Sequence, residues 1–405
     1  MPLPRVSLKS FLATAKTAAR AAGASSTPST PVTFVIGNES ADLDSLCSAI
    51  VLAYLRTYAP DSPHSTFYIP LCNIPFADLS LRPELSPILQ RAKISRNDLI
   101  TLSDVQLPHP SPIASEQTNW LLVDHNALQG ELGSRFGGRV IGCIDHHDEE
   151  NKVPRDTGLE PRVVKKSGSC SSLVVQYGRA AWDALSKDSK TNNEVASWNA
   201  DLAYVALAPI LIDTTYLKSK DKTTKDDIEA VSYLESMITA IPGNRYDGEA
   251  YFQELSKAKE SIDDLSLNDI LRKDYKQWTE NNLNLGISSV VKDVHFLVNK
   301  AGGIDNFLQV LKAFAEERKL SICSIMTTSN PNGQFQRELL VWGMDEKGIA
   351  SAKQFFEKDA SKLGLETWSE GKLDSHDDGW RQCWIQKELA SSRKQVAPLL
   401  RACMG

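Results

Sequence analysis

The chain has 405 residues, of which 41% are hydrophobic and 24% are charged, a composition typical of a globular protein with two or three domains. Its formal net charge of −6 argues against general binding to nucleic acid or to a membrane surface. No apolar run approaches the roughly 18 positions of a membrane span. The seven cysteines form no Cys-x-x-Cys pair, which favours free thiols in a reducing compartment.

The N-terminal segment is basic and contains no acidic residue before Glu39. Its apolar residues from Phe11 to Ala22 recur at helical spacing, so we predict a helix that Ser7 caps and that packs on the first domain. The alternative is a mitochondrial transit peptide, because that class is also basic and rich in serine. The packed helix predicts a cytoplasmic protein, and the transit peptide predicts the mitochondrial matrix. A connector rich in Ser, Thr and Pro completes this segment, which we place at residues 1–30.

Three apolar runs, each of which we interpret as a buried strand, end in side chains that can bind metal ions. These side chains are Asn38, Asp42 and Asp44 after Thr33–Gly37, Asp124 and His125 after Trp120–Val123, and His146 and His147 after Val140–Ile144. Ligands of open α/β sheets bind at the carboxyl ends of the strands. Clustered carboxylates repel one another unless a cation lies between them. Although each residue alone is equally well explained as a helix cap or a solvated turn, the set predicts a pair or more of divalent cations.

Strands that alternate with helices predict a parallel sheet for the first domain. The predicted elements are a second strand at Ser65–Ile69 and helices at Ser172–Ala184, Asn199–Ile212 and Asp226–Ile241. Pro242–Asn244 then breaks the helical pattern, so we place the first domain at 31–242 and a second α/β domain at 250–405. Apolar runs of the second domain are Leu285–Val291, Leu320–Thr327 and Glu338–Trp342.

The strand-end motifs resemble those of a known family. Asn38-x-x-x-Asp42-x-Asp44, Val123-Asp124-His125-Asn126 and Asp145-His146-His147, in this order, are similar to the DHH phosphoesterases, and most of all to the fungal cytosolic exopolyphosphatases, which are relatives of the family II inorganic pyrophosphatases. The resemblance runs from Thr33 to Leu400, through Gly168–Ser172, Ile212–Thr215 and Ser392–Gln395. It implies an α/β fold with two domains: an N-terminal parallel-sheet DHH domain, a smaller C-terminal substrate-binding domain, and an active site in the cleft between them.

The resemblance also implies roles for single residues. Asp124 would bridge two metals. Asn38 and Asp42 would bind one metal, and Asp44, His146 and Asp213 would bind the other. The expected catalytic residues are Asp124, His146 and His147. The residues expected to contact substrate are His125, His147, Ser169, Lys276, Arg393 and Lys394. Alternatives remain open here, since Ser169 is equally well an ordinary N-cap and Lys276 a solvated lysine. We expect Asp145 to orient a ligand histidine. The lysines from Lys218 to Lys225 either line the path of a polyanion or form a solvated surface.

Oxygen-rich ligands favour two or more divalent cations, Mg²⁺ first, with Mn²⁺ or Co²⁺ as alternatives. Asn38 stands where the pyrophosphatases carry histidine, and its harder amide oxygen moves the preference towards Mg²⁺. The expected reaction is attack of a hydroxide, made by the two metals, on the terminal phosphorus of inorganic polyphosphate, with release of orthophosphate. The expected partner is polyphosphate alone, without nucleic acid or membrane, and the expected state is a monomer. The alternatives are an inorganic pyrophosphatase, a DHH phosphodiesterase acting on short nucleotides, and a catalytically idle scaffold of the prune-like kind.

Overall fold

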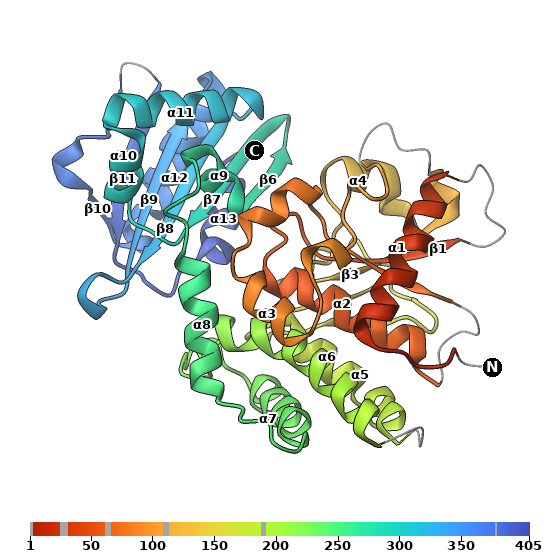
Figure 1. Cartoon of the computed structure of the whole chain (residues 1–405). Helices are drawn as coiled ribbons and strands as arrows, with labels where there is room; N and C mark the ends of the chain where they lie inside the picture. The colour runs from red at the N-terminus through yellow and green to blue at the C-terminus, as the bar shows by residue number, and fades with distance from the viewer. Residues whose placement is uncertain (1–2, 25–30, 61–65, 108–112, 188–191, 377–378) are drawn as a thin grey trace. The chain divides into compact units, whose positions relative to one another are not determined.

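Two β-sheets organise the part of the chain that the computed structural model describes, which is residues 3–24, 31–60, 66–107, 113–187, 192–376 and 379–405 (Figure 1). Each sheet belongs to one of two units, Met1–Lys259 and Glu260–Gly405, hereafter unit 1 and unit 2. The predicted α/β architecture with two domains is confirmed.

The sheet of unit 1 is wholly parallel and has the strand order β2-β1-β3-β4-β5. Its strands are β1 (Val32–Ile36), β2 (Tyr68–Leu71), β3 (Thr118–Val123), β4 (Val140–Asp145) and β5 (Arg162–Val164). Helices cover both faces of such sheets, which is why the central strands are continuous apolar runs. The second strand begins at Tyr68, later than predicted, because its pairing with β1 starts at Thr33 opposite Tyr68 and ends at Ile36 opposite Leu71. Ser65 lies outside the described residues.

Helices supply most of the core of unit 1. They are α1 (Leu8–Ala24), α2 (Leu43–Tyr58), α3 (Leu85–Arg91), α4 (Gly130–Phe136), α5 (Cys170–Ser186), α6 (Asn192–Asp213), α7 (Lys225–Thr239) and α8 (Gly248–Glu260), with 3-10 helices at Phe76–Leu81, Arg96–Asp98, Ser115–Gln117 and Gly137–Arg139. Every residue of α2 is buried. By length and composition α6 could cross a membrane, but 72% of its apolar window is buried inside the protein. That burial is typical of the central helix of a folded core.

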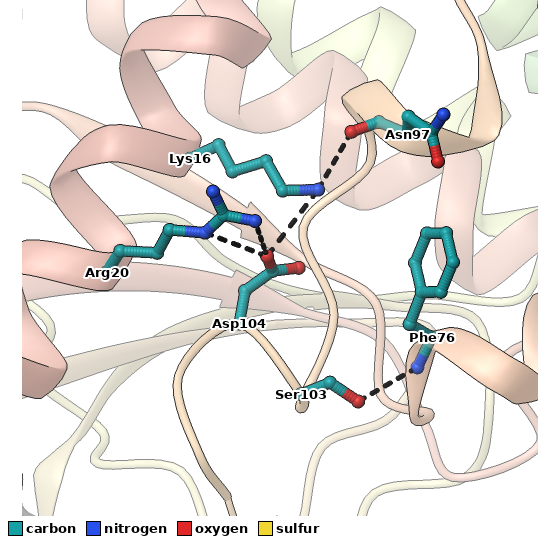
Figure 2. A pocket seen from close by; sticks show the side chains of 6 residues that line it. All are labelled: Lys16, Arg20, Phe76, Asn97, Ser103 and Asp104. Carbon is teal, nitrogen blue, oxygen red and sulfur yellow. Dashed lines mark hydrogen bonds and ion pairs between the residues drawn. The ribbon is translucent and has the colours of Figure 1, made fainter.

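The predicted N-terminal helix is confirmed as α1, and it packs on the rest of unit 1. Ser7 caps it through a hydrogen bond that its Oγ accepts from Ser10 N at 3.2 Å. Phe11 is fully buried, with its ring 5.3 Å from that of Tyr54. Two basic residues bind the outer side of α1 to the rest of unit 1. Lys16 Nζ donates to Asn97 O, and Arg20 pairs with Asp104 at 2.8 Å (Figure 2). Lys16 Nζ also donates to Leu99 O. Basic residues that suggest a transit peptide by composition therefore have structural partners here.

Unit 2 contains a mixed six-stranded sheet in the order β10-β11-β9-β8-β7-β6, in which only β7 and β8 pair in parallel. The strands are β6 (Tyr275–Glu280), β7 (Leu283–Val290), β8 (Ile322–Ser329), β9 (Gln336–Gly343), β10 (Leu365–Thr367) and β11 (Trp380–Gln386). The helices are α9 (Leu267–Lys273), α10 (Val294–Ala301), α11 (Ile304–Glu317), α12 (Glu346–Leu363) and α13 (Arg393–Arg401), with 3-10 helices at Pro331–Gly333 and Ser369–Gly371. Alternate residues of the strands enter two separate apolar clusters, one with α11 and one with α12 and α13. The three predicted apolar runs correspond to β7, β8 and β9.

The division between the units lies at Lys259, whereas we predicted a break at Pro242–Asn244 and a second domain from residue 250. The break is the turn between α7 and α8, and α8 still belongs to unit 1. Tyr251 and Leu255 of α8 lie in the core of that unit, and Arg91 binds Glu254 at 2.6 Å. Proline and glycine mark a turn, but they do not reveal whether the next helix packs back on the preceding domain.

Candidate metal centre

The strand order brings the predicted site residues to one place. β1 lies between β2 and β3, so the chain leaves β1 towards one edge of the sheet and leaves β3 towards the other. In doubly wound sheets ligands bind at the carboxyl ends of the strands where the order reverses in this way. Asn38, Asp42 and Asp44 follow β1, and Asp124 follows β3. The adjacent β4 ends at Asp145, which directly precedes the histidine pair.

The centre consists of Asp124, His146 and His147, whose ligand atoms all lie within 4.8 Å of one another. Asp124 Oδ1 is 3.1 Å from His146 Nε2 and 3.7 Å from His147 Nδ1. A second carboxylate joins them, because Asp44 Oδ2 is 3.7 Å from His146 Nε2. Asp124 is 2% exposed and His146 is 8% exposed, so water screens these groups poorly.

The backbone and neighbouring side chains hold Asp124 in one orientation. Its φ of 60° is left-handed, a conformation that costs a residue other than glycine about 1–3 kcal/mol. Oδ2 accepts hydrogen bonds from Asn38 Nδ2 and from Ser45 Oγ, both at 2.7 Å. The backbone N–H of Asp124 donates to Ile144 O at 3.0 Å and contacts Cys170 Sγ at 3.2 Å. Oδ2 is therefore engaged by the protein, and Oδ1 faces the imidazoles.

Asn38 orients Asp124 in this structure. The amide nitrogen donates to Asp124, and the amide oxygen accepts from Ser40 N at 2.9 Å. Our assignment of Asn38 as a metal ligand stays a prediction. An asparagine is both donor and acceptor and its oxygen has two lone pairs, so its residue type fits both roles.

The histidines are fixed through their Nδ1 atoms. His146 Nδ1 is 3.1 Å from Ser167 O, and His147 Nδ1 is 2.8 Å from Asp145 Oδ1. Because a carbonyl oxygen and a carboxylate can only accept, both Nδ1 atoms carry the proton. In neutral His146 the unprotonated Nε2 then faces the carboxylates of Asp44 and Asp124, so that three acceptors converge. A cation fits between them, which is the usual arrangement of a metal-binding histidine supported through its other nitrogen.

Asp145 holds the imidazole of His147, which we predicted as a substrate contact; that Asp145 orients a metal-ligating histidine stays a prediction. It is fully buried, and its Oδ1 also accepts from the backbone N–H groups of His146 and His147. Asn126 Nδ2 donates to Oδ2 at 2.6 Å. Burial alone would raise the pKa of Asp145, but the hydrogen bond and the charge of His147 outweigh it and lower that pKa to about 2.

Negative charge accumulates around the centre. Burial, and then the charges of Asp124 and Asp213, raise the pKa of the Asp44 carboxyl well above its usual value, against the opposing effect of His146. Asp42 adds to the same repulsion. Its Oδ1 also accepts from Ser45 N at 3.1 Å and so caps α2. The donor set of Asp42, Asp44, Asp124, Asp213 and His146 therefore fits hard divalent cations, because oxygen ligands dominate it and its carboxylates repel one another.

Comparisons with known proteins identify the family of the chain. A model of the N-terminal domain of the DHH family matches residues 32–207, and a model of the DHHA2 domain matches residues 253–403. A Schizosaccharomyces pombe protein named "Putative exopolyphosphatase" is 35% identical over 368 residues, which cover 91% of this chain and 90% of that protein. The chain belongs to the DHH family. The resemblance inferred from the motifs is confirmed.

More distant relatives of this DHH protein include a human protein named exopolyphosphatase PRUNE1, which is 26% identical over 92% of this chain and 75% of its own length. A manganese-dependent inorganic pyrophosphatase of Methanocaldococcus jannaschii is 27% identical over 68% of this chain and 77% of its own length. A crystal structure described as a "Methanococcus jannaschii putative family II inorganic pyrophosphatase" has a TM-score of 0.60, 23% identity, and coverage of 92% of this chain and 99% of that chain. With 23% identity, this similarity shows that the two chains share a fold, and nothing about function.

Two residues of the DHH domain that we predicted as substrate contacts, Ser169 and His125, are buried and hydrogen-bonded to the protein. Ser169 is fully buried and caps α5, and its Oγ donates to Asp44 at 2.8 Å. Cys170 N and Ser171 N donate to the same carboxylate, so the anion at this helix N-terminus is Asp44. The N-cap alternative for Ser169 is correct. His125 is buried, with its Nδ1 2.9 Å from Val123 O.

The predicted cations of the DHHA2 domain lie in unit 2. Arg393, at the start of α13, donates to Asp274 Oδ1 at 2.7 Å and to Asp274 O at 2.9 Å. Lys276 lies on β6 two residues after Asp274, and Lys394 is exposed. In unit 1, Lys218 pairs with Glu249 and Lys225 with Glu229. These pairs favour the solvated-surface interpretation of that lysine run.

Proposed function

We propose that this DHH protein is a metal-dependent exopolyphosphatase that removes the terminal phosphate of inorganic polyphosphate and releases orthophosphate. The observation that carries the proposal is the convergence of Asp44 Oδ2, Asp124 Oδ1 and His146 Nε2, three buried groups that a divalent cation would hold together. The name of the Schizosaccharomyces pombe relative, which is similar over nearly the whole chain, supports the substrate. We propose two or more divalent cations, Mg²⁺ with Mn²⁺ or Co²⁺ as alternatives.

The residues of the centre have two roles in this proposal, to bind the cations and to orient the residues that bind them. Divalent cations, when bound, would neutralise the phosphoryl oxygens and lower the pKa of water. Asp124, His146, Asp44, Asp42 and Asp213 would hold them. Asn38 and Ser45 keep Asp124 Oδ1 directed at the centre, so little reorganisation is needed when charge develops in the transition state.

We propose that His147 serves the leaving group. Its Nδ1–H is committed to Asp145, and its side chain is 24% exposed, so its Nε2 is the atom that can hold a proton towards the oxygen of the departing phosphate. The Asp145 carboxylate, whose pKa is lowered to about 2 chiefly by this contact against the effect of burial, stabilises the charged imidazolium. We further propose that Arg393, Lys394 and Lys276 bind phosphates of the substrate, since arginine grips phosphate oxygens in a bidentate manner.

An inorganic pyrophosphatase is the second candidate, because a relative that carries that name matches 68% of this chain. The experiment that separates the candidates is release of orthophosphate from long-chain polyphosphate and from pyrophosphate, measured side by side with Mg²⁺ and with Mn²⁺. We expect faster hydrolysis per enzyme on polyphosphate. Preferential hydrolysis of pyrophosphate would replace our proposal with the second candidate, and no hydrolysis of either would refute both.

A further inference from the structure

Asp227, near the start of α7, is a fully buried carboxylate that no step above uses. It accepts six hydrogen bonds of 2.6–3.2 Å: from Ser167 Oγ, Gly168 N, Ser169 N, Ser172 Oγ, and Thr224 N and Oγ1. Burial opposes its ionisation, but the hydrogen bonds of Ser172, Thr224 and Gly168 outweigh that effect and lower its pKa. Four of the six donors belong to residues 167–172, which lie more than fifty positions earlier in the chain.

Residues 167–172 form a segment with Asp227 on one side and the metal centre on the other. Ser167 O receives the Nδ1–H of His146 at 3.1 Å. Ser169 Oγ and the N–H groups of Cys170 and Ser171 donate to the Asp44 carboxylate at 2.6–2.9 Å. The segment therefore sets the orientation of an imidazole and of a carboxylate that both face Asp124.

Gly168 gives independent evidence that this segment has one position only. A Cβ at residue 168 would lie 2.6 Å from Thr214 Cγ2 and 2.9 Å from Asp227 Oδ2, closer than real contacts allow. Thr214 directly follows Asp213, the remaining carboxylate of the proposed metal set. The segment is thus fitted between Asp227 and the end of α6, with no room for a side chain.

We propose that Asp227 is a positioning residue for the metal centre. Its carboxylate holds residues 167–172 so that Ser167 O turns His146 Nε2 towards Asp124 and the α5 N-terminus orients Asp44. The inference rests on the proposed function in that the centre must bind divalent cations. The competing explanation is local: Thr224 and Asp227 form a capping box at the start of α7, and that alone would account for a buried aspartate.

The experiment compares Asp227→Asn with Thr224→Ala. The first keeps the shape of the side chain, but its NH₂ group meets the donors that the carboxylate accepted from. The second removes the threonine hydroxyl from the same capping box and leaves the bonds from Asp227 to Ser167, Gly168, Ser169 and Ser172. Mn²⁺ affinity of the full chain is measured without substrate, by titration calorimetry and by electron paramagnetic resonance, with the unfolding temperature recorded beside it.

We expect both variants to lower the unfolding temperature, but only Asp227→Asn to weaken Mn²⁺ binding, by about 10- to 100-fold, as loss of a partner that supports a ligand does. Wild-type affinity in Asp227→Asn, or an equal loss in Thr224→Ala, would reduce Asp227 to a helix cap. Should Asp227→Asn not fold, Ser167→Ala removes one donor at the residue that contacts His146, and unchanged Mn²⁺ affinity there would also overturn the inference.

This outcome is separable from that of the proposed function. A wild-type protein that hydrolyses polyphosphate, together with normal Mn²⁺ binding by Asp227→Asn, refutes the positioning role alone. A wild-type protein that binds Mn²⁺ without hydrolysing polyphosphate, together with weakened binding by Asp227→Asn, refutes the function and leaves the positioning role intact.

Discussion

Replacement of Asp124 by asparagine should separate metal binding from folding. Asn has the same shape, its oxygen can still accept from Asn38 and Ser45, and its NH₂ group can donate to His146 Nε2 across the present 3.1 Å. The variant also loses a negative charge near Asp44. The two carboxylates both approach His146 Nε2, so their nearest oxygens lie within about 7 Å, where two like charges repel by roughly 2 kcal/mol at an effective dielectric of 20.

Relief of that repulsion stabilises the variant. Against it, two hydrogen bonds change from charge-assisted to neutral, and each loses about 1 kcal/mol of stabilisation. We therefore expect the free energies of unfolding of wild type and Asp124→Asn in chelator to agree within about 1 kcal/mol. Metal should then separate the two proteins. Mn²⁺ at 100 times its dissociation constant adds about 2.7 kcal/mol to the wild type, and the variant should gain far less.

The assay is calorimetric unfolding in chelator and in Mn²⁺, paired with orthophosphate release from polyphosphate. For units of this size about 1 kcal/mol moves the unfolding temperature by 2–4 °C, so the wild-type shift should be measurable. Hydrolysis should fall at least about 10²-fold. Asp221→Asn, which removes one exposed carboxylate, is the charge control. Equal stabilisation of Asp124→Asn and wild type by Mn²⁺, or near-normal hydrolysis by the folded variant, would refute the assignment of Asp124 to the metals.

Three further changes test other parts of the argument. Arg393→Ala should lower kcat/KM on polyphosphate about 10²-fold while Mn²⁺ affinity stays unchanged, and Arg393→Lys should restore only part; a wild-type value in Arg393→Ala would place this side chain outside the site. Phe11→Ala should cost about 3–5 kcal/mol in urea unfolding because the ring is fully buried, and no loss would mean that α1 does not stabilise unit 1. Asn38→Ala should weaken Mg²⁺ and Mn²⁺ binding by the same factor, because it acts through Asp124; a changed preference between the metals would instead show that the amide oxygen binds metal.

The sequence predicts the sheet of unit 1 well, and with it the core of the site. The strands of a buried parallel sheet are unbroken apolar runs, and such runs stand out against loops that are polar. Asp124 directly follows β3, and His146 directly follows β4. Locating each strand in the sequence therefore also locates the side chain. Their proximity then follows from strand order, because the ends of neighbouring parallel strands share one edge.

The residues that support the ligands are not predictable in the same way. Thr224-x-x-Asp227 is a capping-box signal, and the capping box is present, but nothing local indicates that Asp227 also binds residues 167–172. Gly168 between two serines was the available hint, because a glycine at a helix start is required where another chain segment approaches closely. Such contacts depend on how α5 and α7 pack, which the pattern of either helix alone does not contain.

Asn38 and Ser169 both give donors to carboxylates of the predicted metal set. Asn38 donates to Asp124 and Ser169 donates to Asp44. Even with these donors in place, the pKa of Asp44 stays raised by burial and by Asp124 and Asp213. Neutral hydrogen bonds orient the carboxylates but cannot cancel their charge in a buried site. A divalent cation bound by His146 Nε2 and both carboxylates would supply the positive charge that offsets this repulsion.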